Sequence, residues 1–214
     1  MKNLIKEYKE IFLESPKYYI DTGGRFEIIG NHTDHNHGLC IVANCSLRIK
    51  AVLDKDDEIV DIKSKGYDRF SFSLSSLSNY NDYENKTKAL VAGILIKLKE
   101  LGYKIGGFKA YIESDIPDGS GVSSSAAVES LIGYIISYLY NNKSIPELVI
   151  AKVGQFSENH YFKKPCGLLD QIGTSFSNCN YIDFKDIDNP VLENLDFNLP
   201  LNLYLVKSIL LAIK

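Results

Sequence analysis

The sequence lacks the features that would assign it to a membrane, to a nucleic acid or to an oxidising compartment. No apolar run reaches the roughly 20 residues that a membrane-spanning helix needs, and the N-terminal ten residues lack a signal-peptide core. The 24 Lys and Arg residues are outnumbered by 27 Asp and Glu, so no basic surface for nucleic acid is expected. The four cysteines form no C-x-x-C pair, which argues against a zinc ribbon or a disulfide framework. We therefore expect a cytoplasmic protein that binds neither membrane nor nucleic acid.

The composition is that of a globular protein, and the hydrophobic pattern mixes short strands with longer helices. With 214 residues and 45% hydrophobic content, the chain can form one domain, or one domain and the beginning of another. The elements do not alternate as regular βαβ units, which favours an α+β fold in which a mixed sheet packs against helices. Strands are predicted near 26–29, 39–43, 47–53, 59–62, 70–74 and 108–112, and helices near 4–12, 84–101, 123–140, 144–161 and from about 168.

Two local signals set expected element boundaries. A turn is expected at Gly23–Gly24, before the first strand. The segment 144–147, SIPE, reads as a capping box that opens the fourth helix.

A glycine- and serine-rich turn, residues 117–127 (PDGSGVSSSAA), lies between a predicted strand and a strongly periodic helix. Gly119 and Gly121 permit positive φ and a close approach to a ligand. Residues 123–125 are serines at a helix N-terminus, which carries roughly +0.5 of an elementary charge and attracts anions. No Lys follows the last glycine, so this is not a Walker P-loop. A serine N-cap on a core helix is the alternative interpretation, but three serines behind two glycines favour a phosphate site.

Three of the four histidines fall within residues 30–38, GNHTDHNHG. One interpretation is zinc binding by the histidines together with Asp34. A second is a polar pocket that hydrogen-bonds a ligand rich in hydroxyl groups. The third is a solvated turn between two strands.

Two carboxylates are ambiguous on sequence grounds. Glu158 lies near the C-terminal end of its predicted helix, where an anion is disfavoured. A solvated surface residue or a metal ligand would both explain that position. Asp170 falls in the first turn of the next predicted helix, where an acidic residue is favourable without any further role.

Taken together, three segments resemble the galactokinases of the GHMP kinase family. Residues 24–36, GRFEIIGNHTDHN, are similar to the galactokinase signature, and 117–127 are similar to the family's phosphate motif. Residues 165–171, PCGLLDQ, resemble the family's Pro-Cys-Gly-Ile-Met-Asp-Gln motif. The three occur in the family's order, and the likeness runs from about Tyr18 to about Val206.

The resemblance implies a catalytic pair and a sugar site. Arg25 and Asp170 match the catalytic pair: Asp170 would take the proton of the anomeric hydroxyl or orient it, and Arg25 would neutralise charge on the transferring phosphoryl group. The matching substrate-binding residues are Asn31, His32, Asp34 and Gly167.

The resemblance also implies ATP and Mg²⁺ as cofactors. Glu158 matches a Mg²⁺ ligand together with Ser124 or Ser125, since hard oxygen ligands suit that ion. The residues expected to hold the ATP phosphates are Gly119, Ser120, Gly121, Val122, Ser123, Ser124 and Ser125. The implied reaction converts galactose and ATP to galactose 1-phosphate and ADP, by a protein expected to be a monomer at full length.

The chain departs from the family pattern in two ways. Asn31 stands where the family has Glu, which leaves the choice among galactose, a derivative or an epimer open. The family continues into a second domain, whereas this sequence stops at Lys214 after an apolar run at 209–213. We expect a galactose-binding signature segment over 1–45, an ATP-binding GHMP N-terminal domain over 46–200, and the truncated start of a C-terminal domain over 201–214.

Three other functions compete with a galactokinase. A sugar sensor on the same fold would bind sugar without consuming ATP. A zinc hydrolase would contain stoichiometric zinc at the histidine cluster. An inactive fragment would expose apolar surface and aggregate.

Overall fold

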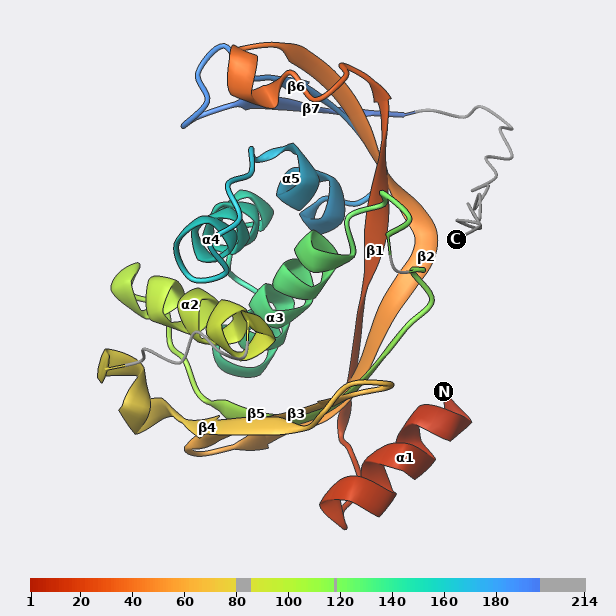
Figure 1. Ribbon diagram of the computed structural model, residues 1–214, viewed down its shortest axis with the longest axis vertical. Helices are drawn as coiled ribbons and strands as arrows, with labels where there is room; N and C mark the ends of the chain where they lie inside the picture. The colour runs from red at the N-terminus through yellow and green to blue at the C-terminus, as the bar shows by residue number, and fades with distance from the viewer. Residues whose placement is uncertain (80–85, 118, 197–214) are drawn as a thin grey trace, which may run out of the picture.

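The alternating side chains of two central strands separate the core from a smaller cluster on the other side of the sheet. The structure, a computed structural model, describes residues 1–79, 86–117 and 119–196. On one face of β2 (Leu39–Asp56) and β5 (Gly107–Ser114), Leu53 and Ala110 are fully buried in the main core. Their neighbours Val52 and Tyr111 point to the other face and pack against α1 (Lys2–Phe12). Helices α2 to α5 lie inside the curve of the sheet and α1 lies outside it (Figure 1).

The sheet is mixed, as the sequence predicts. Its order is β4-β3-β5-β2-β6-β7, and β1 pairs with β2 off this path. All described pairings are antiparallel except the parallel one between β3 and β5. The remaining strands are β1 (Tyr18–Ile29), β3 (Ile59–Ser64), β4 (Phe70–Ser73), β6 (Cys179–Asp183) and β7 (Val191–Leu195).

The helix α3 (Ser124–Tyr140) lies at the centre of the helical layer. It is apolar nearly all round, as expected for a helix enclosed by other elements, and it contacts β1, β2 and the helices α2, α4 and α5. The other helices are η1 (Asp34–Asn36), η2 (Leu74–Asn79), α2 (Lys86–Glu100), α4 (Glu147–His160) and α5 (Leu169–Ser175). None of the described helices is long and apolar enough to cross a membrane.

The turn predicted at Gly23–Gly24 is wrong. Both glycines lie inside β1, where the register against β2 shifts between Gly23 and Arg25. From Gly23 to Arg25 the register advances two residues on β1 and four on β2, from Arg48 to Asn44, so the extra residues lie on β2; such irregularities occur often beside active sites. A Cβ on Gly24 would lie 2.7 Å from the Val122 carbonyl oxygen, so glycine there allows β1 to approach the turn before α3 closely.

The capping box predicted at Ser144 is also wrong. Pro146 holds the N-cap position of α4, and no side chain caps this helix. The Ser144 hydroxyl donates instead to the Asn141 carbonyl, within the preceding turn. Strands β6 (CNYID) and β7 (VLENL) were not predicted, because neither keeps an alternation of apolar and polar residues over its length. The predicted start of the second helix at Glu84 and the apolar run at 209–213 lie outside the described residues.

The central position of α3 yields a stability prediction. Leu131 is fully buried in the main core, so Leu131→Ala should lower the free energy of unfolding by about 2–5 kcal/mol through lost burial and a cavity. Denaturant titration measures this loss. The matched control Leu101→Ala, at a half-exposed position, should cost less than about 1 kcal/mol. Equal losses in the two variants would contradict the proposed place of α3 in the core.

Candidate active site

Arg25 joins three separate segments of the chain. Its Nε and Nη2 atoms donate to Asp170 Oδ1 at 2.9 and 2.6 Å, which ties β1 to the first turn of α5. Its Nη1 donates to the Gly121 carbonyl at 2.9 Å, and its backbone N–H donates to the Val122 carbonyl at 3.0 Å. Arg25 is only 6% exposed. A buried guanidinium with fork-shaped contacts fixes position more tightly than a single ion pair would.

Ser123 completes this network from the opposite side of Asp170. Its hydroxyl donates to Asp170 Oδ2 at 2.6 Å, so each oxygen of the carboxylate has its own partner. The Ser123 backbone is left-handed, with φ 58° and ψ 59°, which is unusual for a residue with a side chain. Such strain persists where surrounding contacts over-determine it, often at functional sites.

The start of α3 is not capped by a side chain. Ser123 holds the N-cap position, but its hydroxyl is bound to Asp170 rather than to the helix backbone. The serine-cap interpretation therefore holds for the position of Ser123 but not for its side chain. The N–H groups of the first turn stay open to an external acceptor, which is the arrangement that binds anions. The turn before them includes the exposed Gly121 at φ 74°, a conformation that glycine adopts without strain.

A cavity of about 510 Å³ opens directly beside these serines. Ser124 and Ser125 line one part of it. Five other segments line the rest, mainly with aromatic and aliphatic side chains; the polar members of these segments are Ser64, Lys65, Asp68, Thr87 and Ser114. A polar end joined to an apolar chamber suits a ligand with charged and flat apolar parts. Sequence analysis missed the chamber because its members lie far apart in the chain and share no motif; they include Tyr67, Phe70, Thr87, Leu90 and Phe162.

Glu158 lies next to Ser125, one of the serines that line the cavity, and its surroundings fit a hard cation. Its Oε1 accepts hydrogen bonds from the Ser125 hydroxyl at 3.2 Å and from Lys164 Nζ at 3.1 Å. Hydroxyl and carboxylate oxygens are the protein ligands that Mg²⁺ prefers, usually one or two beside the phosphates of a substrate. Of the two serines predicted as metal ligands, Ser125 contacts Glu158, whereas no contact of Ser124 with it is observed. The surface interpretation of Glu158 is wrong, because this residue is 2% exposed.

Behind Glu158 lies a buried polar pair that the sequence did not single out. Gln171 Nε2 donates to Glu158 Oε2 at 2.9 Å and to Glu129 Oε2 at 3.0 Å. Burial, and next the negative charge of Glu158, raise the pKa of Glu129 well above its usual value. Both residues stand in or beside the recognised motifs, but only the fold shows that their side chains meet. Gln171, which is itself bonded to Glu129, thus holds Glu158 Oε2 in place.

Two of the predicted sugar-binding residues meet next to Asp170. The buried Asp34 accepts a hydrogen bond from the Leu169 backbone N–H at 3.1 Å, one residue before Asp170. Gly167 approaches Asp34 so closely that an added Cβ would lie 1.8 Å from its Oδ2. Only glycine fits there, which explains the Gly of the 165–171 motif in physical terms.

Asn31 and His32 lie on an exposed loop after β1. Both residues are left-handed, with φ 55° and 54°. The His32 backbone N–H donates to Glu27 Oε1 at 2.9 Å, and its ring nitrogen Nδ1 lies 3.3 Å from Glu27 Oε2. Glu27, which sequence analysis missed, thus provides a carboxylate to the loop in which Asn31 carries none.

The histidines of residues 30–38 do not converge on one point. His35 Nδ1 lies 3.3 Å from Asp34 Oδ1, while His37 Nδ1 lies 3.0 Å from the Lys185 carbonyl oxygen. In the part of the chain that the structure describes, no three His, Cys, Asp or Glu side chains are grouped to hold a metal ion. The geometry thus argues against the zinc interpretation and leaves the polar pocket and the solvated turn.

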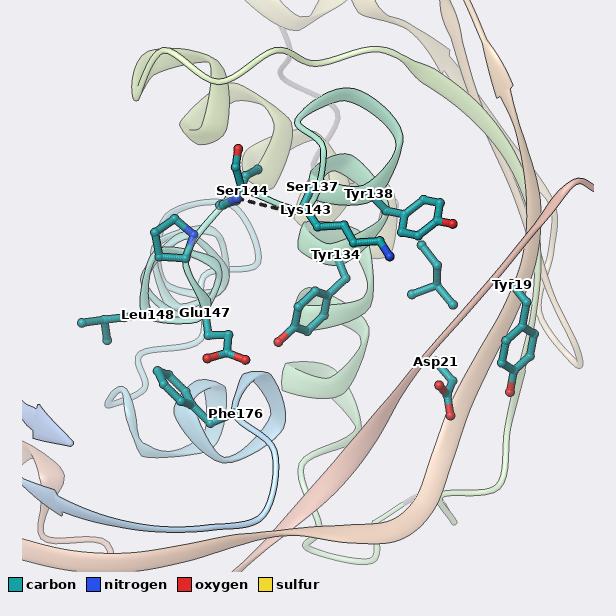
Figure 2. Close-up of a pocket in the computed structure, with 13 residues that line it drawn as sticks. Tyr19, Asp21, Tyr134, Ser137, Tyr138, Lys143, Ser144, Glu147, Leu148 and Phe176 are labelled. Atoms are coloured by element: carbon teal, nitrogen blue, oxygen red, sulfur yellow. Dashed lines mark hydrogen bonds between the residues drawn. The ribbon is translucent and has the colours of Figure 1, made fainter. Parts of the chain in front are cut away.

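A second cavity, of about 660 Å³, is separate from this site. Figure 2 shows Tyr134 and Tyr138 of α3 on one side of it, with Tyr19 and Asp21 of β1 opposite. None of the residues predicted for the sugar, the phosphates, the metal or catalysis lines it. It therefore lies outside the chemistry built around Asp170.

The sequence of the chain is similar to two family models and to curated proteins. A model of the GHMP kinases N terminal domain matches residues 89–178, and the galactokinase galactose-binding signature matches residues 6–55. The curated galactokinase of Lactococcus lactis subsp. cremoris is 33% identical over 180 residues, which cover 81% of this chain and 44% of that protein. The chain spans about half the length of the curated relatives it matches.

Solved structures give the same result at the level of the fold. The crystal structure of Lactococcus lactis galactokinase complexed with galactose superposes with a TM-score of 0.78 and 26% identity, over 91% of this chain and 52% of that one. The Methanococcus jannaschii mevalonate kinase shares the fold, with a TM-score of 0.68 at 17% identity over 84% of this chain and 56% of that one. With both family models matched in the order that the motifs predict, the chain belongs to the galactokinases of the GHMP kinase family.

Proposed function

We propose that the protein transfers the γ-phosphoryl group of ATP to the anomeric hydroxyl of galactose, with this chain supplying the sugar and phosphate sites. The observation that carries the proposal is that Arg25 and Ser123 both donate hydrogen bonds to Asp170 at the N-terminus of α3. Because the chain spans about half of its relatives, turnover is proposed for the protein at full length, and binding for the chain itself.

Asp170 is the proposed partner of the attacking hydroxyl. Its side chain is 34% exposed, so a sugar hydroxyl can reach it although both oxygens already accept hydrogen bonds. A carboxylate has about four acceptor sites, which leaves room for one more donor. Asp170 would orient the anomeric hydroxyl and accept its proton as the new O–P bond forms.

The phosphates are proposed to bind at the uncapped start of α3. Residues 123–125 connect the Arg25–Asp170 pair to the 510 Å³ cavity without a break in the chain. The γ-phosphoryl group would face Asp170, while the base of ATP would enter the apolar chamber. Arg25 and the helix N–H groups would offset charge that moves onto the leaving ADP oxygen, and phosphoryl transfer depends mainly on such positioning and compensation.

Mg²⁺ is the proposed metal, held by Glu158 Oε1 and the Ser125 hydroxyl. Bound there, the ion would supply positive charge that offsets the charge of the phosphates. A cytoplasmic location and a monomeric state at full length complete the proposal; both rest on the resemblance to the family.

The sugar is proposed to lie between Asp170 and the loop after β1. Asp34 and Gly167 sit beside Asp170, which supports contacts to ring hydroxyls there. Asn31 and His32 would close the site from the exposed loop, with Glu27 holding the His32 backbone.

Two measurements test the proposal directly. Titration calorimetry of the chain should show one galactose site, and phosphorus NMR of the full-length protein with galactose and Mg²⁺-ATP should show galactose 1-phosphate. Galactose binding without ATP consumption at full length would instead identify a sugar sensor. No galactose binding, and no sugar phosphate, would reject the function.

Asp170→Asn should abolish catalysis and spare substrate binding. The amide keeps the size of the side chain but is a far weaker proton acceptor, so turnover should fall by roughly 100- to 10,000-fold. Coupled assay of ADP release measures this loss, and calorimetry should find galactose affinity within about threefold of wild type. The matched control Asp115→Asn changes an exposed carboxylate that pairs with Lys50, and should leave turnover unchanged. Normal turnover of Asp170→Asn would remove Asp170 from the mechanism.

Arg25→Lys should lose activity and stability although it keeps the positive charge. Lysine has no fork to bond Asp170 and the Gly121 carbonyl at once, so the carboxylate and the phosphate turn would lose their common anchor. We expect turnover to fall at least about 100-fold and the melting temperature to fall by several degrees. Arg48→Lys, which alters a comparable contact to Asp21 away from the site, is the control. A fully active Arg25→Lys enzyme would show that positive charge alone is enough.

A further inference from the structure

The two oxygens of the Glu158 carboxylate have different surroundings. Oε2 points inward and is fixed by the amide of Gln171, which also bonds Glu129. Oε1 meets the Ser125 hydroxyl and Lys164 Nζ, and Ser125 also lines the cavity beside the start of α3. Only Oε1 is therefore placed to meet a ligand that enters from the phosphate side.

The carboxylate of Glu158 is almost completely buried, with 2% exposure. Burial of a charge without a partner is costly, and the cost falls when an opposite charge lies in contact. Lys164 Nζ, at 3.1 Å from Oε1, supplies that charge.

The ammonium group of Lys164 has room to move away from Glu158. Its side chain is 61% exposed, so the flexible stem has solvent to move into. Its backbone does not need to follow, because the Lys164 N–H donates to the Glu158 carbonyl at 3.1 Å and holds the loop to the end of α4.

We propose that Lys164 is a displaceable counter-ion that competes with Mg²⁺ for Glu158 Oε1. The inference rests on the proposed function, since it takes Glu158 and Ser125 as the metal ligands. Two cations cannot share one carboxylate oxygen without repulsion, so the ammonium must withdraw as the metal enters. The Glu158 carboxylate is then paired with either the ammonium group or the metal ion. Competition from Lys164 keeps the affinity for free Mg²⁺ low, so that Mg²⁺ binds mainly together with the ATP phosphates.

The test is a Mn²⁺ titration followed by electron paramagnetic resonance, with Mn²⁺ alone as the probe. Lys164→Met should bind Mn²⁺ roughly two- to tenfold more tightly than wild type, because a competing ion pair is gone. Lys164→Arg, which keeps a competing cation, should stay within about twofold of wild type. Thermal unfolding of each variant checks that the fold is intact.

Two further variants separate competition from general charge effects. Lys152→Met removes one positive charge from α4, the helix that carries Glu158, at a residue that contacts Asn189. This variant should change Mn²⁺ affinity less than about twofold. Glu158→Gln should remove the site altogether. Unchanged or weaker binding by Lys164→Met overturns the proposal, and so does Mn²⁺ binding that survives in Glu158→Gln or is absent from all variants.

Nitrogen NMR of lysine ammonium groups gives an independent reading in the wild-type chain. The Lys164 signal, identified by its loss in Lys164→Met, should shift on addition of Mg²⁺ with the midpoint of the metal titration. A signal that does not respond at saturating Mg²⁺ overturns the proposal. Galactose binding, measured without metal, tests the proposed function separately. A negative result for Lys164 therefore leaves the proposed function standing, and a failure to bind galactose is distinguished from a failure of the counter-ion proposal.

Discussion

The ion pair between Arg25 and Asp170 is the contact on which the arrangement of this site depends. Arg25 comes from β1, Asp170 from the first turn of α5, and the Gly121 carbonyl from the turn that precedes α3. Gly121 and Asp170 lie 96 and 145 residues after Arg25 in the sequence, yet the guanidinium of Arg25 bonds both. A buried charge without its partner is strongly destabilising. The contact that orients Asp170 therefore also fixes the positions of α3 and α5 relative to β1.

The site divides its carboxylates by their surroundings. Asp170 is partly exposed and bonded on both oxygens, in the position of a group that meets a substrate. Glu158 is buried but faces a cation on one side, and Glu129 is enclosed with a raised pKa. Three acids within one layer of helices therefore differ in their contacts with solvent and with cations, and this difference suits them to different tasks.

Sequence analysis predicted the mixed sheet and the long helices, because periodicity and turn chemistry act locally, and the resemblance to the family implied that Arg25 and Asp170 form a pair. It misjudged features set by tertiary contacts. Gly23–Gly24 read as a turn, but pairing with β2 keeps both residues in a strand. Ser123 read as a helix cap, but its hydroxyl finds Asp170, 47 residues away. The apolar chamber and the pair of Glu129 with Gln171 had no sequence signal, since their members come together only in the fold.

The most direct test of this account is a crystal structure of the protein with galactose and a non-hydrolysable ATP analogue. The account predicts the anomeric oxygen within about 2.6–3.2 Å of the Asp170 carboxylate, with the γ-phosphate over the N–H groups at the start of α3. Galactose bound elsewhere, with Asp170 still closed between Arg25 and Ser123, would contradict it.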